Sequence, residues 1–404
     1  MSDKPQAVIL AAGKSTRVYP LTVTQPKPLL PVANQPILAH NLDRLVGLVD
    51  EAVIIVGYRR NMIENHFGNE YRGIRLIYVE QKEQLGAGHA ILQAEPFIRD
   101  RFVMMVGDDL CARVDIEAAL KYPNSAVGKR VPNPQSFGVL THQDGILQKI
   151  VEKPKEFVGD LASTGLHTFD RRIFECLKNI PKSPRGEYEA ADGTNRLASM
   201  TPVQCLELQG YWFPIGFPWD LLNANEYFLE SLEADIQGDV EPGAVIKGPV
   251  VIGKGTRVCS GAYIEGPTLI GEDCLIGPGA FIRPKTTLGN GVTVGHGTEL
   301  KNSIVMNNSV INYGCYIADS VLAENVNVGA STVVANWRHD GSTVKSVVKS
   351  TLVDTGRERF GTVIGAGARI GIKTGIYPGR KIWPGLTTRP GEIIKNDITN
   401  LKLD

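Results

Sequence analysis

The sequence predicts two successive folds: an α/β doubly wound domain with a mainly parallel sheet, then a left-handed parallel β-helix of hexapeptide repeats. In the first part, short apolar runs alternate with segments of helical periodicity. In the second part, an aliphatic residue recurs every six positions. Glycine divides the chain at the same point, because 17 of the 43 Gly lie in residues 1–237 and 26 in the shorter remainder. We therefore predict domains at 1–237 and 238–404.

Four apolar runs are the expected core strands of the first domain. They are AVILAAG, EAVIIVGY, IRLIYVEQ and FVMMVGDD. A helical pattern at 37–49 separates the first two runs, and this alternation places helices on both faces of the sheet. The last expected helix runs from about Asp220 to Leu232. The Gly and Pro of the following QGDVEPG are stop signals, so the domain ends there.

The second domain is defined by aliphatic residues that point inward, one on each side of a three-sided coil. These positions are Ile246, Ile252, Val258, Ile264, Ile270, Ile276, Ile282, Leu288, Val294, Leu300 and Met306. The register then slips by one residue to Ile311 and Ile317. A polar tract at about 335–362 interrupts the repeat, which resumes at Ile364. We expect this tract to be an arm or loop that leaves the coil and has a functional or intersubunit role.

Charge and composition exclude several classes of partner. The chain carries 43 Lys+Arg and 43 Asp+Glu, so it lacks the basic surface that nucleic acids or anionic membranes would need. No apolar run approaches the length of a bilayer or a signal-peptide core. The six cysteines show no metal-binding spacing. We expect a cytoplasmic protein with reduced cysteines and no nucleic-acid or membrane partner.

A turn of small residues directly follows the first expected strand. The segment AAGKST contains a sequence like a P-loop, but Val8 stands where a P-loop needs its first Gly. The backbone N–H groups of Ala11 to Gly13 can instead approach phosphates at the carboxyl edge of the sheet. Arg17 and Lys27 then place two cations on loops near that edge.

The pattern G-x-x-T-R-x-x-P from Gly13, with Lys27-Pro28 ten residues after Arg17, resembles the signature of sugar-1-phosphate nucleotidylyltransferases. Later segments follow in the family's order: YVEQ ending at Gln81, Leu85-Gly86, VGDD containing Asp108, Phe137-Gly138-Val139, Glu152-Lys153-Pro154, Thr164-Gly165-Leu166, and Arg185-Gly186-Glu187-Tyr188. Together with the β-helix, the set resembles the long, archaeal-type enzymes that are similar to glucose-1-phosphate thymidylyltransferase and bifunctional N-acetylglucosamine-1-phosphate uridylyltransferase.

This resemblance implies a phosphoryl-group chemistry in which a sugar 1-phosphate oxygen attacks the α-phosphate of a nucleoside triphosphate and expels pyrophosphate. A phosphate anion is already a nucleophile, so catalysis must come from positioning and charge neutralisation. By resemblance, Arg17 clamps the leaving pyrophosphate and Lys27 meets the α-phosphate. Asp108 would hold Mg²⁺, which takes one or two carboxylates and leaves its other positions to phosphates and water.

The resemblance also implies the residues that bind the sugar 1-phosphate. Glu152 accepts the sugar hydroxyls, while Lys153 and Arg185 meet the sugar phosphate. Gly138 and Gly165 permit close approach of the backbone to the sugar. Glucose and N-acetylglucosamine 1-phosphates are both open at this stage.

The nucleotide side is implied by four residues. Ala11 and Gly13 belong to the phosphate turn, and Gln81 with Gly86 lies at the base. A side-chain amide can accept the imide N–H of uracil or thymine and donate to a carbonyl. A pyrimidine nucleotide is therefore favoured, and UTP and dTTP are not distinguished.

One departure concerns the metal. Family members usually carry a second metal-binding Asp in a W-x-D-x-G motif, but this chain has Trp212-Phe213-Pro214-Ile215-Gly216. Proline cannot bind a metal. Asp220 could substitute, but an Asp that opens a helix is more often its N-cap. Only Asp108 is therefore predicted as a metal ligand.

The β-helix raises two alternatives. Bifunctional relatives acetylate an amino-sugar phosphate with acetyl-CoA, but Tyr313 stands where they carry the His base, and Ser342 replaces an expected Lys. His339 or His296 could serve as a replacement base. A non-catalytic sensor of nucleotide sugars is the other alternative. Otherwise the β-helix is expected to assemble the chain into a homotrimer or a higher multiple.

Overall fold

The computed structural model describes residues 4–399, and these form two compact units. The first, here the sheet unit, comprises residues 4–14, 26–29 and 37–214. The second, the coil unit, comprises residues 15–25, 30–36 and 215–399. The two units interleave along the sequence, whereas the predicted domains are contiguous. The boundary at 237 stays a prediction about where the chain can be divided into independently folding parts.

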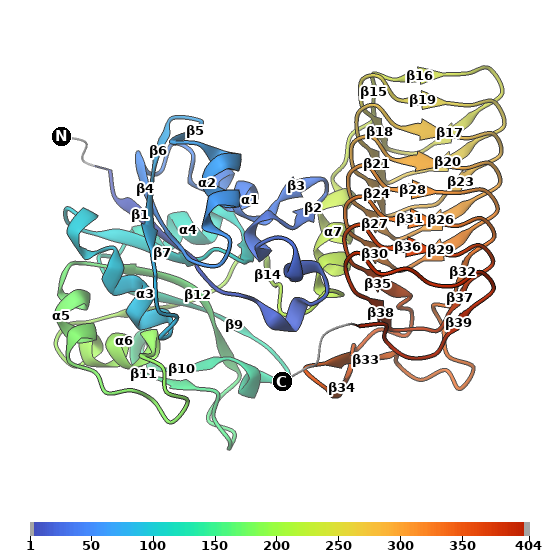
Figure 1. Cartoon of the computed structure of the whole chain (residues 1–404). Helices are drawn as coiled ribbons and strands as arrows, with labels where there is room; N and C mark the ends of the chain where they lie inside the picture. The colour runs from blue at the N-terminus through green and yellow to red at the C-terminus, as the bar shows by residue number, and fades with distance from the viewer. Residues whose placement is uncertain (1–3, 400–404) are drawn as a thin grey trace. The chain divides into compact units, whose positions relative to one another are not determined.

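A ten-stranded sheet organises the sheet unit (Figure 1), in the order β10-β11-β13-β9-β12-β7-β1-β4-β6-β5. Its strands are β1 Gln6–Ala11, β4 Glu51–Val56, β5 Glu70–Tyr71, β6 Ile74–Glu80, β7 Phe102–Val106, β9 Ser125–Arg130, β10 Gly138–Gln143, β11 Ile146–Glu152, β12 Leu161–Phe169 and β13 Gln204–Glu207. Strands β7, β1, β4 and β6 run parallel, while β12 pairs antiparallel with both β7 and β9. The doubly wound α/β fold is confirmed; the sheet is parallel at its centre, and antiparallel pairs flank that centre.

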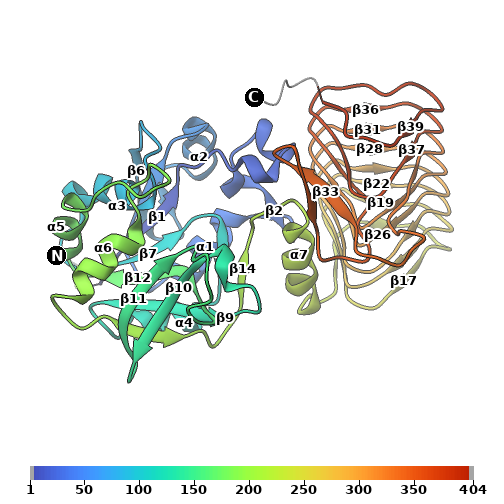
Figure 2. The same cartoon turned by 90° about the horizontal axis from the view of Figure 1, so that it is seen from below.

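Helices cover both faces of this sheet because successive side chains of each strand point to opposite sides. On β1, Val8 packs into one apolar cluster, with residues of α3 (Ala87–Gln93), α5 (Arg172–Lys178) and α6 (Ala190–Ala198). Its neighbour Ile9 packs into another, with α1 (Ile37–Leu45), α2 (Arg60–Phe67) and α4 (Arg113–Leu120). Figure 2 shows the helices on either side of the strands.

Three parallel sheets form the sides of the coil unit. The first contains β15 Asp235–Ile236, β18 Val250–Ile252, β21 Thr268–Ile270, β24 Thr286–Leu288, β27 Ile304–Val305, β30 Val321–Leu322, β35 Thr362–Ile364 and β38 Arg380–Ile382. The second contains β16 Asp239–Val240, β19 Arg257–Val258, β22 Leu275–Ile276, β25 Thr293–Val294, β28 Val310–Ile311, β31 Asn327–Val328 and β36 Arg369–Ile370. The third contains β17 Val245–Lys247, β20 Tyr263–Glu265, β23 Phe281–Ile282, β26 Glu299–Lys301, β29 Tyr316–Ala318, β32 Val333–Val334, β37 Gly375–Ile376 and β39 Ile393–Ile394. Such stacked coils are consistent with the expected left-handed β-helix (Figure 1).

The hexapeptide prediction is right for every inward position up to Leu300 and wrong for Met306. Leu288 pairs with Val305, and Val305 is the residue in the central core. The step from Leu300 to the next core residue, Val305, is five residues instead of six, so the register slips before Met306 rather than after it. The side chain of Met306 meets Gln25 instead.

Two further elements of the coil unit lie outside the coils. Helix α7 spans Asp220–Glu230 and lies beside the first sheet of the coil in both views (Figures 1 and 2). The polar tract between β32 and β35 forms a hairpin of β33 (Lys345–Val348) and β34 (Thr351–Asp354). No helix among residues 4–399 is long and apolar enough to span a membrane.

Candidate active site

The phosphate turn lies at the carboxyl edge of the sheet unit. Ala11 is the buried last residue of β1, and Gly13 is exposed. The carbonyl oxygen of Ala12 accepts hydrogen bonds from the backbone N–H of Tyr58 at 3.1 Å and from the side-chain amide of Gln84 at 2.8 Å. These contacts hold the turn against the loops that follow β4 and β6. Gln84 was not predicted, since its contact depends on how the two loops meet.

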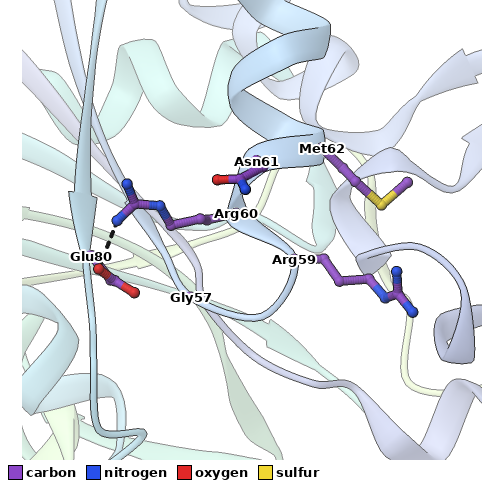
Figure 3. A pocket seen from close by; sticks show the side chains of 6 residues that line it. All are labelled: Gly57, Arg59, Arg60, Asn61, Met62 and Glu80. Atoms are coloured by element: carbon purple, nitrogen blue, oxygen red, sulfur yellow. Dashed lines mark hydrogen bonds and ion pairs between the residues drawn. The ribbon is translucent and has the colours of Figure 1, made fainter.

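A hollow of about 500 Å³ opens beside this turn (Figure 3). It is lined by Gly57, Arg59, Arg60, Asn61, Met62 and Glu80. Arg60 forms an ion pair with Glu80 at 2.6 Å, and a Cβ added to Gly57 would lie 2.9 Å from the oxygen of Ala12. Gly57 therefore lets the wall of the hollow pack directly on the turn. None of the predicted site residues lines it.

Lys27 and Asp108 form the charged centre of the sheet unit. Lys27 belongs to a short 3₁₀ helix, η3 (Lys27–Leu29), and Asp108 follows β7. Their side-chain Nζ and Oδ2 atoms are 2.5 Å apart. The Lys27 side chain is 6 % exposed and that of Asp108 is 33 % exposed, so the carboxylate neutralises a buried ammonium and still reaches solvent. The sequence assigned these two residues to one reaction centre, and the fold brings them together.

The position of the missing second carboxylate is adjacent to this pair. Strand β14 (Trp212–Pro214) pairs with β8 (Asp109–Cys111), and Pro214 stands opposite Asp109. The indole N–H of Trp212 donates to Asp109 Oδ2 at 3.0 Å. Among residues 4–399 no group of three His, Cys, Asp or Glu side chains is placed to hold a metal ion. A hard cation at this site would have Asp108 as its predicted protein ligand and phosphate or water oxygens as the others, which fits Mg²⁺.

The predicted sugar-binding charges form one network. Glu152 Oε1 lies 3.7 Å from Lys153 Nζ and 3.3 Å from Arg185 Nη2. Arg185 Nη2 also donates to both carboxylate oxygens of the buried Glu189, at 2.8 and 2.9 Å. Burial raises the pKa of Glu152, against the opposing effect of Lys153 and Arg185. Glu189, which fixes the Arg185 guanidinium, was missed, although it follows directly on the RGEY segment.

The two predicted sugar-site glycines stand where a side chain would collide with this machinery. A Cβ on Gly138 would lie 3.0 Å from Glu152 Oε2. Gly165 has φ +72°, and a Cβ there would lie 2.9 Å from the Val106 side chain at the end of β7. A side chain at either position would therefore collide with a neighbouring side chain, and the approach of the backbone to the sugar stays a prediction.

The fold also brings together Gln81 and Gly86, the two residues predicted to bind the base. Gln81 Nε2 donates to the carbonyl oxygen of Gly86 at 3.1 Å and lies 3.1 Å from His89 Nδ1. Gly86 has φ +102°, and a Cβ there would be 2.7 Å from the carbonyl oxygen of Tyr188. Tyr188 in turn donates its N–H to Leu85 at 2.8 Å, which ties the base-side loop to the segment carrying Arg185.

Arg17 is the one predicted site residue that belongs to the coil unit. It lies in the 3₁₀ helix η1 (Thr16–Val18), and its guanidinium carbon is 5.5 Å from the ring centroid of Phe217. Asp220 Oδ2 accepts the backbone N–H groups of Gly216 and Phe217 at 2.8 and 2.7 Å. Asp220 therefore holds the loop that precedes α7, while Trp219 occupies the N-cap position.

The residues expected for acetyl transfer are scattered over the arm and coils. Tyr313 is exposed, and its ring centroid is 5.6 Å from that of His296. Asn336 donates to the buried carboxylate of Asp319 at 2.5 Å, so its amide serves the coil itself. Within residues 4–399, the one aromatic ring that His339 meets is that of Trp337, with centroids 6.2 Å apart.

Comparison with known proteins agrees with this arrangement. Residues 6–231 match the nucleotidyl transferase family, and residues 264–377 match the family described as the GMPPB C-terminal domain. The chain is 37 % identical to bifunctional protein GlmU of Methanocaldococcus jannaschii, over 97 % of this chain and 95 % of that protein.

Two further relatives and one solved structure extend the comparison. A bifunctional sugar-1-phosphate nucleotidylyltransferase/acetyltransferase of Sulfurisphaera tokodaii is 35 % identical over 97 % of this chain and 98 % of that protein. The UTP–glucose-1-phosphate uridylyltransferase AglF of Haloferax volcanii is 34 % identical over 56 % of this chain and 97 % of its own length. A crystal structure of UDP-glucose pyrophosphorylase with UDP-glucose shares the fold, with a TM-score of 0.52 and 22 % identity over 56 % of this chain and 99 % of that one. The chain therefore belongs to the nucleotidyl transferase family, and it is a nucleotidyltransferase with an added β-helix.

Proposed function

We propose that this enzyme condenses a hexose 1-phosphate with a pyrimidine nucleoside triphosphate to give a nucleoside diphosphate sugar and pyrophosphate. The observation that carries the proposal is the buried Lys27 paired with Asp108 in the same unit as the Glu152–Arg185 network and the Gln81–Gly86 loop. A cation beside the reacting phosphate, an anion-binding sugar side and an amide at the base are the groups that this reaction needs.

Within this proposal each residue has one task. Lys27 stabilises the negative charge that develops on the α-phosphate, and Arg17 grips the leaving pyrophosphate with its two-pronged guanidinium. Arg185 and Lys153 bind the sugar phosphate, and Glu152 accepts the sugar hydroxyls. Asp108 would hold Mg²⁺, which supplies further charge neutralisation at the phosphates when bound.

UTP is the first nucleotide to test, with dTTP as the alternative. The relative from Haloferax volcanii, 34 % identical, is named for UTP and glucose 1-phosphate. Gln81 supports either base, because an amide pairs with the imide edge that uracil and thymine share. Glucose 1-phosphate and N-acetylglucosamine 1-phosphate are the first sugars to test.

The experiment is a matrix of pyrophosphate release. The full chain is incubated with Mg²⁺ and each of ATP, CTP, GTP, UTP and dTTP against glucose, galactose, mannose, glucosamine and N-acetylglucosamine 1-phosphates. Release with a pyrimidine nucleotide and one of these sugars is the expected result. No release in any pair would defeat the proposal. Binding of a nucleotide sugar without turnover would instead support the sensor alternative.

Acetyl transfer by the β-helix is a second candidate activity. Its support is the relative from Sulfurisphaera tokodaii, which is named as an acetyltransferase as well and is matched over 97 % of this chain. Tyr313 is the argument against it, because a phenol is a much poorer general base than the imidazole that it replaces. Free thiol released from acetyl-CoA in the presence of glucosamine 1-phosphate would establish the activity, and its absence would exclude it for that substrate.

We also propose that the third sheet of the coil mediates a homotrimer or a higher multiple. The outward-facing residues in register along this sheet are mostly apolar: Val245, Tyr263, Phe281, Glu299, Tyr316, Val333, Gly375 and Ile393. A flat apolar face of a solenoid is suited to packing against copies of itself. Sedimentation equilibrium should give a multiple of three chains, and Val333→Glu should reduce it. A monomeric wild-type chain would contradict the proposal.

A further inference from the structure

A row of two cations and two aromatic rings crosses the coil unit. The guanidinium of Arg17 lies over Phe217, 5.5 Å from its centroid. Phe217 stacks on Trp219 with centroids 4.6 Å apart and planes at 9°. The ammonium of Lys381, on β38, lies 5.8 Å from the centroid of Trp219. We call these four residues the cation–ring row.

The Arg17 end of the row is exposed, while the other end is buried. Trp219 is 3 % exposed and Lys381 is 1 % exposed. The ring of Phe360, at the end of the arm, meets the ring of Trp219 edge-on, with centroids 5.7 Å apart. Because Trp219 is packed on two sides by the β-helix and its arm, the ring of Phe217 has a fixed support to stack on.

Arg17 itself depends on this support. Within residues 4–399 its guanidinium makes no hydrogen bond or ion pair, and the ring of Phe217 is the contact that orients it. A guanidinium stacked on a ring keeps its N–H groups in the plane free for a phosphate. The loop carrying Phe217 is held in turn by Asp220, which accepts the N–H groups of Gly216 and Phe217.

Lys381 anchors the buried end of the row to the arm. Its ammonium donates to the carbonyl oxygen of Val347 on β33 at 2.7 Å. Burial lowers its pKa to about 8; nearby Asp397 raises the value and Arg380 lowers it. The backbone N–H of Lys381 also donates to Asp397 Oδ1 at 2.9 Å. The buried lysine therefore joins β38, the hairpin and the ring of Trp219.

We propose that Phe217, Trp219 and Lys381 are positioning residues for Arg17, so that the β-helix braces the cation that grips the leaving pyrophosphate. The inference rests on the role given to Arg17 in the proposed function. Its physical basis is preorganisation: a guanidinium already held over a ring loses less freedom when it binds a pyrophosphate.

The test is binding of inorganic pyrophosphate, with Mg²⁺ in excess, to the full-length chain by titration calorimetry. Arg17→Ala defines the contribution of the clamp and should weaken binding at least tenfold, as expected for a charge-assisted contact. Phe217→Leu should weaken it about fivefold, the size of one exposed cation–ring contact. Phe217→Tyr keeps the ring and should restore wild-type binding. Lys381→Met should weaken binding about threefold, and the control Trp337→Leu, at an exposed ring of the arm, should change nothing.

A kinetic readout separates positioning from general loss of structure. With the active substrate pair, Phe217→Leu should raise KM for the nucleotide and leave KM for the sugar phosphate unchanged. If Arg17→Ala binds pyrophosphate like wild type, the role of Arg17 in the proposed function is wrong. If Arg17→Ala binds weakly but Phe217→Leu binds like wild type, this inference is overturned. Should Lys381→Met fail to fold, the Phe217→Leu and Phe217→Tyr pair alone decides.

Discussion

Lys27 and Asp108 form one short ion pair, but their side chains differ in exposed fraction. Variants of the two residues should therefore differ in stability. Replacing Lys27 leaves a carboxylate that reaches solvent, whereas replacing Asp108 leaves a buried ammonium without that pair.

We predict that Lys27→Met and Asp108→Asn each lower kcat by about 10²- to 10³-fold, because both remove charge stabilisation at the reacting phosphate. Asp108→Asn should also lower the melting temperature, because it removes the carboxylate charge paired with a buried ammonium. Steady-state kinetics and thermal unfolding measure the two effects. Near-normal turnover in either variant would refute the role assigned to that residue.

His167 gives the sheet unit a response to acid. It is buried on β12, stacks on Phe169 and contacts Ser163, and its Nδ1 atom is without a hydrogen-bond partner within the described chain. Burial lowers its pKa to about 4. Between pH 6.5 and 4 the unfolded chain therefore binds a proton that the folded chain does not, and stability is lost as pH falls through this range.

The variant His167→Phe should remove this loss of unfolding free energy, which is about 3 kcal/mol between pH 6.5 and pH 4. Urea unfolding of wild type and variant at pH 7 and pH 4.5 measures it. The control His142→Gln changes an exposed histidine on β10 and should behave like wild type. Equal acid sensitivity in wild type and His167→Phe would show that His167 is not the group responsible.

Several site residues could be predicted from the sequence because local motifs carry them. Lys27 and Asp108 lie in segments that resemble a family signature, and the fold pairs them. Glu189 and Gln84 could not be predicted in this way. Their roles arise from loops that meet only in the folded chain, where they hold Arg185 and the carbonyl of Ala12.

Helix α7 carries a side chain, Glu226, that contacts several separate parts of the coil unit. Glu226 accepts hydrogen bonds from Arg357 of the arm at 2.7 Å, from Asn302 at 3.0 Å and from Lys285 at 3.1 Å. Burial opposes its ionisation, but these three donors outweigh burial and lower its pKa. One carboxylate thus joins the helix, two coils and the arm.

We predict that Glu226→Gln costs about 2 to 3 kcal/mol, since it removes the charge that three partners share in a partly buried site. The arm should then be cut faster by a protease of broad specificity. The matched control is Glu117→Gln, whose surface ion pair with Arg113 is worth at most about 1 kcal/mol. Equal stability of the two variants would mean that the contacts of Glu226 do not hold helix α7, the two coils and the arm together.

The inward-pointing aliphatic residues predicted the coils, because an aliphatic residue at every sixth position corresponds to one short side of a three-sided coil. The slip at Met306 could not be placed from the sequence, where Met306 still satisfies the period. It depends on the turn at Asn302, whose backbone takes a left-handed φ of +44° and whose amide serves Glu226 and Asp319.

For the whole molecule, the question is whether the nucleotidyltransferase part works without the β-helix. The sequence predicts that truncation near Glu241 leaves a domain with its own sheet and core. The coil unit, however, includes residues 15–25 and 30–36. Asn34 donates to the carbonyl of Leu288 at 2.6 Å, and Gln25 contacts Met306.

We now predict that a chain ending at Glu241 folds its sheet but retains less than about a tenth of wild-type activity, because Trp219 and the Arg17 loop lose their packing partners. Turnover and the melting temperature of the truncated chain measure this. The full chain with Lys381→Met is the control for loss of the brace alone. Full activity of the chain that ends at Glu241 would show that catalysis does not need the coils.

The contacts of the first forty residues also set an order of events during synthesis. Gln25 and Asn34 reach partners 281 and 254 residues later in the chain. A ribosome must therefore deliver the coils as far as Met306 before this segment can make both contacts, although the strands of the sheet unit have long since emerged. Contacts of such separation form slowly and late. On the role proposed for Arg17, the newborn chain therefore gains the full support of that residue only after β38, which carries Lys381, has emerged.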